Sequence, residues 1–211
     1  MTESLPPVAP NAVIYHGEIG VTVLDNFITE MERLEVLRLF DDMEDSTVCT
    51  DDGDGELHDQ RTGKRQWVEH TQSQIFYELC TRISLFVGFK LSQAEKVQLL
   101  KYETTEKYDP HFDAFRKDSP QWEHYSKGGQ RIYTAMGYLN DVPEDGGGET
   151  AFPVLGISVR PRARRLLVFS NVGEDRSKPH PDSLHGGMPV VKGTKQCFTI
   201  WFREKPINEP E

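Results

Sequence analysis

Hydrophobic residues recur at helical spacing in two stretches of the first half of the chain. In the first stretch, Thr29 and Glu32 form a capping box ahead of the apolar positions, which predicts a helix near residues 30–43. In the second, apolar residues three or four positions apart predict a helix within residues 71–89 that ends near Gly88. The apolar positions are Leu34, Leu37 and Phe40 in the first helix and Ile75, Leu79, Ile83 and Phe86 in the second.

From residue 95 onward the pattern changes to short β-prone runs separated by Gly, Pro, Asn or Asp. The runs are KVQLLKYE, KYDPHFDAF, RIYTAMGYLN, ISVRP, RRLLVFSN, HGGMPVV and QCFTIWFRE. A short alternation of the same kind lies within residues 13–27. Two helices followed by about seven or eight strands predict an α+β fold, with an antiparallel double-stranded β-helix (jelly-roll) core and the N-terminal helices packed against one sheet.

The last β-prone run has two different faces, because alternate side chains of a strand point the same way. One face carries Phe198, Ile200 and Phe202. The other carries Lys195, Cys197, Thr199, Trp201 and Arg203. The first face is typical of a hydrophobic core. The second combines an ammonium, an indole and a guanidinium, which favours a polar barrel interior over a solvent face.

The chain of 211 residues is long enough for one domain with a substantial core. We expect residues 1–12 to form a disordered tail and residues 13–94 to form a strand-and-helix region that supports the rest of the same domain. The jelly-roll core would cover residues 95–205, followed by a tail over residues 206–211. The acidic segment 44–60 contains DDGDGE but lacks the full pattern of a calcium-binding loop, so a surface loop is expected there.

Charge and cysteine content narrow the possible partners and setting. The formal net charge of −10 argues against a general nucleic-acid binder, because phosphate contacts need clustered Lys and Arg. Cys49, Cys80 and Cys197 are scattered, as expected for free thiols in a reducing compartment. The N-terminal segment lacks signal-peptide character, and no apolar run reaches the roughly 18 residues of a membrane-spanning helix. We therefore expect a cytoplasmic protein that binds neither membrane nor nucleic acid, and no oligomeric state is predicted.

The segment YDPHFDAF places His111 and Asp113 two positions apart in a β-prone run. On a strand, this imidazole and this carboxylate would point to the same face, as ligands of a divalent transition metal would need to do. An isolated pair of this kind would more often lie on a solvated strand, so the rest of the chain has to supply further ligands.

Two further histidines, His180 and His185, are candidates for the third ligand. His185 opens a Gly-Gly strand, in which the missing side chains let another group approach closely, whereas His180 lies between two prolines and is expected to be a solvated loop residue. Two histidines and one carboxylate form the facial triad of non-haem iron oxygenases. Lys195, ten residues after His185, could then bind the far carboxylate of a chelating 2-oxoglutarate.

At this point the sequence resembles the prolyl 4-hydroxylase family of iron(II)/2-oxoglutarate-dependent dioxygenases, from about residue 60 to residue 204. The segments that carry the resemblance are RTGKRQW, LLKYETTEKYDPHFDAF, GGQRIYTAMGYLNDVPEDGGGETAFP, RRLLVFSN and SLHGGMPVVKGTKQCFTIWFRE. Each segment alone is a weak signal. Their order, with H-x-D, a distant histidine and a lysine ten residues later, is a strong one.

The resemblance implies the roles of ten side chains. The implied iron ligands are His111, Asp113 and His185. The implied contacts with 2-oxoglutarate are Lys195 as the anchor, with Tyr102 and Thr150 beside it. The implied contacts with a peptide are Tyr108, Arg131, Trp201 and Arg61, the last from a loop that folds over bound peptide. It also implies Fe(II), 2-oxoglutarate and O2, ascorbate (vitamin C) as reductant, and a proline-containing peptide or protein as substrate.

For five of these side chains the residues leave a structural interpretation open. Tyr102 could be a half-buried strand tyrosine, Thr150 could satisfy a turn after three glycines, and Trp201 could be simple core. Arg131 could lie on the surface of its strand. Tyr108 lies an odd number of positions from the first candidate histidine, so it reaches the site only if the intervening residues break the regularity of the strand.

Departures from the family pattern leave the substrate open. Gln196 stands where the family usually carries tryptophan, and Arg203 where it often carries histidine. One rival function is a related dioxygenase acting on a lysyl side chain or a free amino acid. Another is a non-catalytic jelly-roll protein that binds metal or peptide, although a bare binder has no need of a co-substrate anchor. A purely structural interaction domain leaves the polar face of the last strand unexplained.

Overall fold

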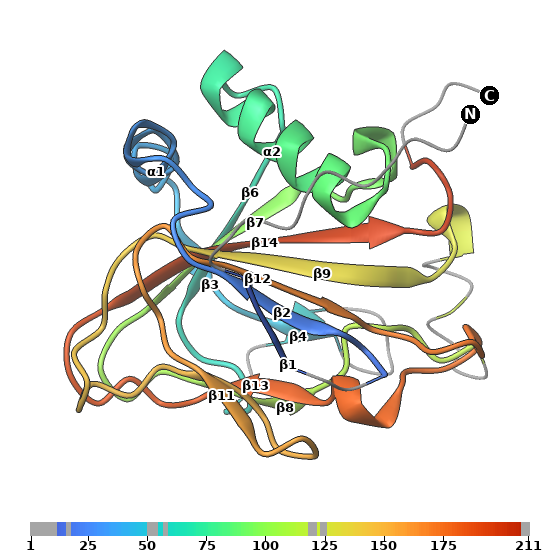
Figure 1. The fold of residues 1–211 in the computed structure, drawn as a ribbon. Coiled ribbons are helices and arrows are strands. Elements are labelled where there is room, and N and C mark those ends of the chain that lie inside the picture. The colour runs from blue at the N-terminus through green and yellow to red at the C-terminus, as the bar shows by residue number, and fades with distance from the viewer. Residues whose placement is uncertain are drawn as a thin grey trace.

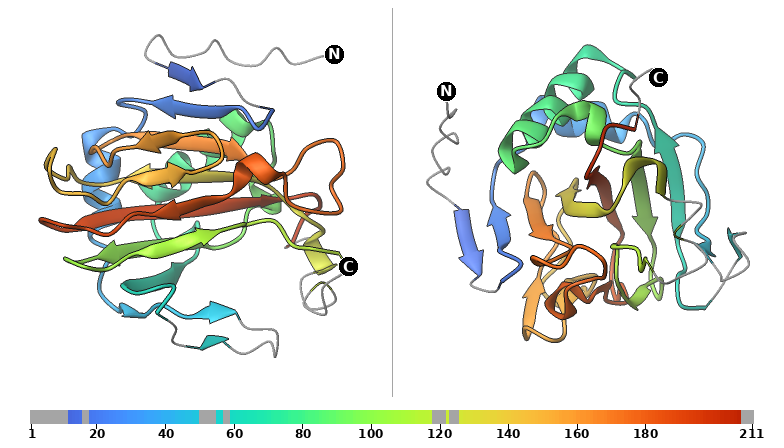
Figure 2. Two further views of the ribbon diagram at one scale, coloured as in Figure 1. Left: turned by 90° about the horizontal axis from the view of Figure 1, so that it is seen from below. Right: turned by 90° about the vertical axis from the view of Figure 1, so that its right-hand side faces the viewer.

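The computed structural model describes residues 12–15, 18–49, 55–56, 59–117, 122 and 126–207. Two antiparallel sheets form the body of this part of the chain, and two helices lie over the outer face of the larger sheet (Figure 1). The side view in Figure 2 shows the smaller sheet on the opposite side of the larger sheet from the helices. The predicted jelly-roll core with helices against one sheet is confirmed.

The larger sheet has eight strands and the smaller sheet has four. In spatial order the larger sheet contains β1 (Ala12–Tyr15), β2 (Val21–Leu24), β12 (Leu166–Ser170), β9 (Arg131–Tyr138), β14 (Lys195–Arg203), β7 (Val97–Tyr102), β6 (Lys64–Val68) and β3 (Glu44–Asp45). The smaller sheet contains β11 (Ile157–Val159), β10 (Thr150–Phe152), β13 (His185–Gly187) and β8 (Tyr108–His111). A separate hairpin pairs β4 (Val48–Cys49) with β5 (Gly55–Glu56). Short 3-10 helices are η1 (Leu91–Gln93), η2 (Ser126–Gly128) and η3 (Pro181–Ser183).

The first helix begins where its capping box predicts, but it is shorter than expected. The capping box of Thr29 and Glu32 starts α1 (Glu30–Leu37), which ends six residues before the predicted boundary. Beyond its end, the backbone N–H of Asp42 donates to the side-chain oxygen of Gln66 on β6, and the Gln66 amide donates to the Asp41 carboxylate. The second helix, α2 (Gln74–Val87), ends at Gly88 in the left-handed conformation, as predicted.

Two hydrophobic layers hold the fold together. The first lies between the helices and the larger sheet and includes the face of β14 that was predicted to be core, Phe198, Ile200 and Phe202. The second lies between the two sheets and includes Tyr138 and Cys197. The two faces of β14 therefore divide as the sequence predicted, one into hydrophobic core and one toward the interior between the sheets.

The N-terminal region contributes strands that the sequence did not predict. β6, with the sequence KRQWV, was not expected because its composition is largely polar, yet it pairs with β7 along its whole length. β1, β2, β3 and β6 all belong to the same sheet as the strands of the predicted core. The proposed division at residues 94 and 95 therefore stays a prediction, and the predicted tails lie largely outside the described residues.

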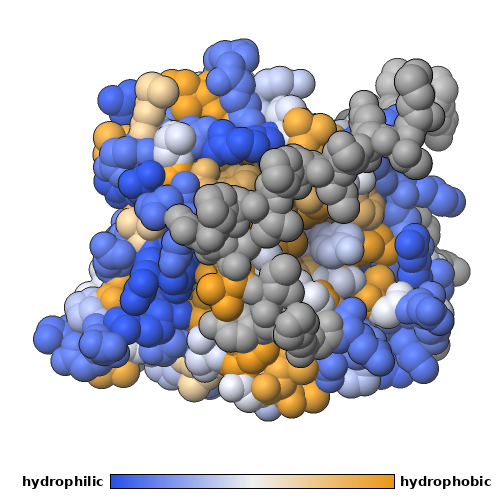
Figure 3. Space-filling view, viewed as in Figure 1, coloured by the Kyte–Doolittle hydropathy of each residue, from blue (hydrophilic) through white to orange (hydrophobic). Residues whose placement is uncertain are grey.

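The hydrophilic residues at the surface and the free thiols agree with the composition of the chain. Hydrophilic residues cover much of the face in Figure 3. Cys80 and Cys197 are buried free thiols, and the side chain of Cys49 lies outside the described residues. Within the described part of the chain, no helix is both long and apolar enough to span a membrane.

Candidate active site

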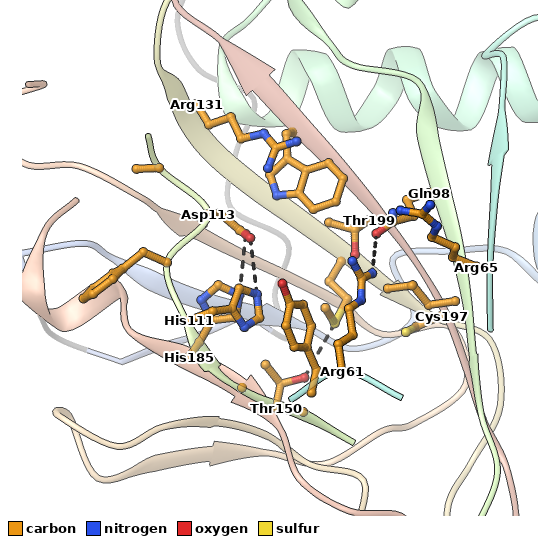
Figure 4. A pocket seen from close by; sticks show the side chains of 18 of the residues that line it. Arg61, Arg65, Gln98, His111, Asp113, Arg131, Thr150, His185, Cys197 and Thr199 are labelled. Carbon is orange, nitrogen blue, oxygen red and sulfur yellow. Dashed lines mark hydrogen bonds and ion pairs between the residues drawn. The ribbon is translucent and has the colours of Figure 1, made fainter. Parts of the chain in front are cut away.

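A histidine–aspartate–histidine cluster lies between the two sheets. His111 ends β8, His185 opens β13 opposite it, and Asp113 follows two residues after His111. Each histidine Nε2 lies 3.5 Å from a different carboxylate oxygen of Asp113. The three donor atoms lie within 4.8 Å of one another, and Figure 4 shows the three side chains pointing toward one another. The predicted convergence of His111 and Asp113 is confirmed, although Asp113 lies just beyond the end of β8 and not on the strand itself.

The cluster fits a first-row transition metal in its donor atoms and in its supporting hydrogen bonds. Nδ1 of His111 lies 2.9 Å from the carbonyl oxygen of Asp109, and Nδ1 of His185 lies 2.9 Å from that of Ser183. Each Nδ1 donates to a carbonyl, which leaves Nε2 with its lone pair facing the carboxylate. Two imidazoles and one carboxylate on one side of a site suit Fe(II).

Burial and neighbouring charges set the protonation states that metal binding needs. Burial lowers the pKa of His185 to about 4, so its imidazole is neutral near pH 7. Burial alone would raise the pKa of Asp113, but His185, His111 and Arg131 outweigh it and hold that pKa below its usual range. A neutral histidine and an ionised aspartate are the forms that ligate a metal.

Asp113 is fixed by a buried relay from the larger sheet. Thr134 on β9 donates to the Asp113 carboxylate over 2.7 Å, and Asn171, just after β12, donates its side-chain amide to the Thr134 hydroxyl over 2.9 Å. Both Thr134 and Asn171 are fully buried. The relay compensates for the lack of strand geometry at Asp113, because it holds the carboxylate from a second element.

All ten side chains singled out from the sequence line one cavity of about 500 Å³. The metal-binding cluster lies on one side of it and Arg61, Thr199 and Gln98 lie on the other (Figure 4). Nε of Arg61, Oγ1 of Thr199 and Nε1 of Trp201 belong to residues of this lining, are buried, and make no hydrogen bond with the residues that the structure describes. Buried polar atoms are normally paired, so these atoms indicate that the cavity receives a polar ligand.

One end of the cavity is built around a buried ammonium. Lys195 is only 2% exposed, and its Nζ lies 5.6 Å from the ring centre of Tyr102 and 5.7 Å from that of Tyr138. Tyr138 donates its hydroxyl hydrogen to Thr150 over 2.7 Å. Burial lowers the pKa of Lys195, and no carboxylate lies within ion-pair distance of it among the described residues. Such a cation is suited to the carboxylate of a small acid.

The opposite end is aromatic and rich in arginine. The guanidinium carbon of Arg131 lies 4.1 Å from the ring centre of Trp201. Glu95 holds Arg131 through two short bonds of 2.6 and 2.7 Å and also binds Arg203 over 2.8 Å. These bonds hold the Arg131 guanidinium against the Trp201 indole at this end of the cavity.

Two irregularities in the strands bring side chains into this cavity. Gly187 pairs with Tyr108 and His185 with His111, so β8 has one residue more than β13 between these pairs. This bulge turns Tyr108 to the same side as His111, and the two rings stack 3.6 Å apart. A second register shift, between Phe202 and Arg203 of β14, turns Arg131 in the same way.

Comparison with known proteins assigns the chain to a family. The sequence model of the 2OG-Fe(II) oxygenase superfamily matches residues 97–203. Prolyl 4-hydroxylase 5 of Arabidopsis thaliana is 33% identical over 214 residues, covering 92% of this chain and 68% of the relative. The chain belongs to the prolyl 4-hydroxylase family. It is a 2-oxoglutarate-dependent dioxygenase, and its histidine–aspartate–histidine cluster fits Fe(II) and 2-oxoglutarate.

Solved structures share the fold of this prolyl 4-hydroxylase family member. The viral collagen prolyl hydroxylase of Paramecium Bursaria Chlorella virus-1, in a 2-oxoglutarate complex, aligns with a TM-score of 0.67 at 22% identity and covers 87% of this chain and 95% of its own. A prolyl hydroxylase in complex with a hypoxia inducible factor peptide fragment, from Trichoplax adhaerens, aligns with a TM-score of 0.59 at 18% identity, covering 87% and 83% of the two chains. At this identity the likeness shows the shared double-stranded β-helix.

The structure places the ten candidate side chains at the cavity and His180 outside its lining. The ten side chains share the cavity, while the roles assigned to them stay predictions. His180 lies outside the cavity lining and in a loop, as expected, but it is not a solvated residue: its partly buried ring contacts Glu18 and accepts from the backbone of Asp182.

Four side chains of the site escaped the sequence reasoning. They are Glu95, Thr134, Tyr138 and Asn171. Thr134 and Tyr138 share strand parity with cavity-lining Met136, which is a signal that could have found them. Glu95 and Asn171 lie just outside strands and carry no local signal.

Proposed function

We propose that this protein is a peptidyl-prolyl 4-hydroxylase, which hydroxylates proline in a peptide or protein while 2-oxoglutarate is converted to succinate and carbon dioxide. The observation that carries the proposal is one cavity that contains the histidine–aspartate–histidine cluster, a buried lysine and an aromatic, arginine-rich end. Its volume of about 500 Å³ is typical of sites for ligands well above the size of 2-oxoglutarate. Family membership and the peptide complex of the Trichoplax relative support a peptide as that larger ligand.

Different residues of the cavity would bind the metal, the co-substrate and the target proline. His111, Asp113 and His185 would hold Fe(II), which when bound supplies the activation of O2 and the oxidation of a C–H bond. Lys195 would bind the far carboxylate of 2-oxoglutarate by charge-assisted hydrogen bonds. Tyr108 and the Trp201 indole would position the proline ring, because the reaction depends on presenting one C–H bond in the right place.

Two accessory assignments complete the proposal. Ascorbate would keep the iron reduced, as the family resemblance suggests. A cytoplasmic setting is supported by the free buried thiols of Cys80 and Cys197, since reducing compartments preserve free thiols.

Mass spectrometry tests the function directly. The protein is incubated in air with Fe(II), 2-oxoglutarate, ascorbate and a panel of proline-containing peptides, with His111→Ala in parallel. We expect a mass gain of one oxygen on proline and stoichiometric succinate, both abolished by His111→Ala. Succinate without oxygen on any peptide would make the enzyme a dioxygenase of another substrate. No succinate from metal-loaded protein would favour the non-catalytic alternative.

A further inference from the structure

Arg61 is a buried guanidinium that forms no ion pair with a carboxylate among the described residues. Its side chain belongs to a residue that is 8% exposed. Nη2 donates to the side-chain oxygen of Gln98 over 2.9 Å and Nη1 donates to the carbonyl of Thr47 over 3.3 Å. Nε is buried and makes no hydrogen bond. None of the ion pairs found in the described part of the chain involves Arg61.

The other buried arginine among the described residues does have a carboxylate partner. Arg203 is 6% exposed and shares the carboxylate of Glu95 with Arg131. A protein with 34 acidic residues therefore places a carboxylate beside one buried arginine and, among the described residues, none beside Arg61. An unpaired buried charge is expensive, so its presence in a cavity indicates that a ligand supplies the missing anion.

The position of Arg61 relates this missing anion to the reaction centre. Its guanidinium carbon lies 4.5 Å from the ring centre of Tyr108, and the same ring stacks on His111 at 3.6 Å. Arg61 is therefore one aromatic ring away from a predicted metal ligand. Among the described side chains that line the cavity, the only carboxylate is that of Asp113, which lies inside the metal-binding cluster.

We propose that Arg61 binds a carboxylate of the peptide substrate, either an acidic side chain next to the target proline or the peptide's own C-terminus. This inference rests on the proposed function, because it names the class of peptide that the same cavity takes. 2-Oxoglutarate is not the expected occupant, since Lys195 already offers a buried cation to its far carboxylate. Arg61 lines the cavity, and a planar guanidinium can bind a carboxylate through two parallel hydrogen bonds.

The first measurement is equilibrium binding, which does not depend on turnover. Protein loaded with Mn(II) and 2-oxoglutarate is titrated without O2 with three blocked-terminus peptides that carry Glu, Gln or Lys beside one proline. The Gln peptide is also prepared with a free C-terminus. We expect the Glu peptide, the free-acid peptide or both to bind about tenfold to a hundredfold more tightly than the blocked Gln peptide, as for a buried charge-assisted hydrogen bond. The two arms show which carboxylate is bound.

Three variants assign the preference to Arg61. Arg61→Gln should remove it, and Arg61→Lys should restore part of it because the charge remains while the bidentate geometry is lost. Arg65→Gln is the matched control, since Arg65 lines the same cavity but already pairs with Glu44 at 3.2 Å. We expect Arg65→Gln to change the ratio of affinities by no more than about twofold. A thermal melt of each variant checks folding, and the wild-type ratio stands even if Arg61→Gln does not fold.

The results separate this inference from the proposed function. Equal affinity of the wild type for all four peptides overturns the inference, whether or not proline is hydroxylated. A preference that survives in Arg61→Gln also overturns it. If Arg61→Gln raises the KM for 2-oxoglutarate in peptide-free succinate formation and leaves the peptide ratio intact, Arg61 serves the co-substrate instead. Tight binding of an acidic peptide without hydroxylation supports the anion site and refutes the proposed function alone.

Discussion

At the scale of single residues, the site depends on groups that orient the metal-binding side chains. Asp113 stands outside any strand, and its carboxylate accepts a hydrogen bond from the Thr134 hydroxyl. The Thr134 hydroxyl accepts from Asn171 and donates to Asp113, which fixes the direction of its single proton. Losing a hydrogen bond of this kind to a metal ligand typically lowers metal affinity by about tenfold to a hundredfold.

Removing the Thr134 hydroxyl should therefore weaken metal binding. Thr134→Val keeps the shape of the side chain but leaves Asp113 without its donor and the Asn171 amide without its acceptor. We expect the dissociation constant for Mn(II), measured by calorimetry, to rise about tenfold to a hundredfold. Thr134→Ser keeps the hydroxyl and should stay close to the wild type. Equal affinities for Val and wild type would show that Asp113 needs no such support.

Lys195 makes a second prediction at this scale. Lys195→Met keeps most of the aliphatic stem and removes the buried charge near Tyr102 and Tyr138. If Lys195 binds the far carboxylate, the KM for 2-oxoglutarate should rise by at least about tenfold. The affinity for Mn(II) alone should change little. An unchanged KM would indicate that another cation binds the far carboxylate of 2-oxoglutarate.

At the scale of elements, the close approach of β13 to β8 decides the geometry of the site. The extra residue of β8 lies against Gly186, where an added Cβ would meet the carbonyl oxygen of Tyr108 at 2.9 Å and the nitrogen of Pro110 at 3.0 Å. Both contacts are with backbone, which cannot turn away. Only a glycine lets the bulge and the His185 strand pair.

Gly186→Ala should separate the two strands. We expect a loss of about 1–3 kcal/mol in the free energy of unfolding, measured with urea on the metal-free protein, because the overpacked backbone has to shift. Gly187→Ala is the control, since its Cβ would meet nothing closer than 3.7 Å. It should stay within about 0.5 kcal/mol of the wild type. Similar stabilities of the two variants would mean that β8 adjusts freely.

At the scale of the whole molecule, one carboxylate joins segments that are far apart in sequence. Glu95 binds Arg131 at the start of β9 and Arg203 at the end of β14, and the Phe115 ring lies 5.0 and 4.8 Å from the two guanidinium carbons. Burial alone would raise the pKa of Glu95, but Arg131 and Arg203 outweigh it and hold that pKa below its ordinary value of 4.5. The free energy of unfolding should therefore depend on pH through this cluster.

The sign of this linkage follows from the lowered pKa. A carboxyl group with a depressed pKa in the folded state adds stability above its unfolded pKa and loses that contribution as pH falls toward the folded value. Glu95→Gln should lower the free energy of unfolding by about 3 kcal/mol at pH 7, because two arginines lose their shared anion. The difference from wild type should shrink as the pH falls below 4.5. Urea titrations at neutral and acidic pH measure it, and a constant difference would contradict the linkage.

The sequence by itself determined the features that depend on near neighbours along the chain. Helix caps at Thr29 and Gly88 rest on local hydrogen bonds and on the backbone freedom of glycine, so they could be predicted. The alternation along Lys195–Arg203 separated the core face from the cavity face for the same reason. The sequence raised His111, Asp113 and His185 as candidate metal ligands, and the resemblance of the surrounding segments to the prolyl 4-hydroxylase family implied that role.

The tertiary structure decided what depends on the opposing strand. Tyr108 and Arg131 enter the cavity only through register shifts, which are set by how β8 and β9 pair with partners distant in sequence. His111 and Asp113 converge as predicted, but β8 ends at His111, and Thr134 holds the Asp113 carboxylate from another strand. The lack of a carboxylate beside Arg61 among the described residues could not be predicted either, because the pairing of a buried charge depends on its folded surroundings and not on the residue type.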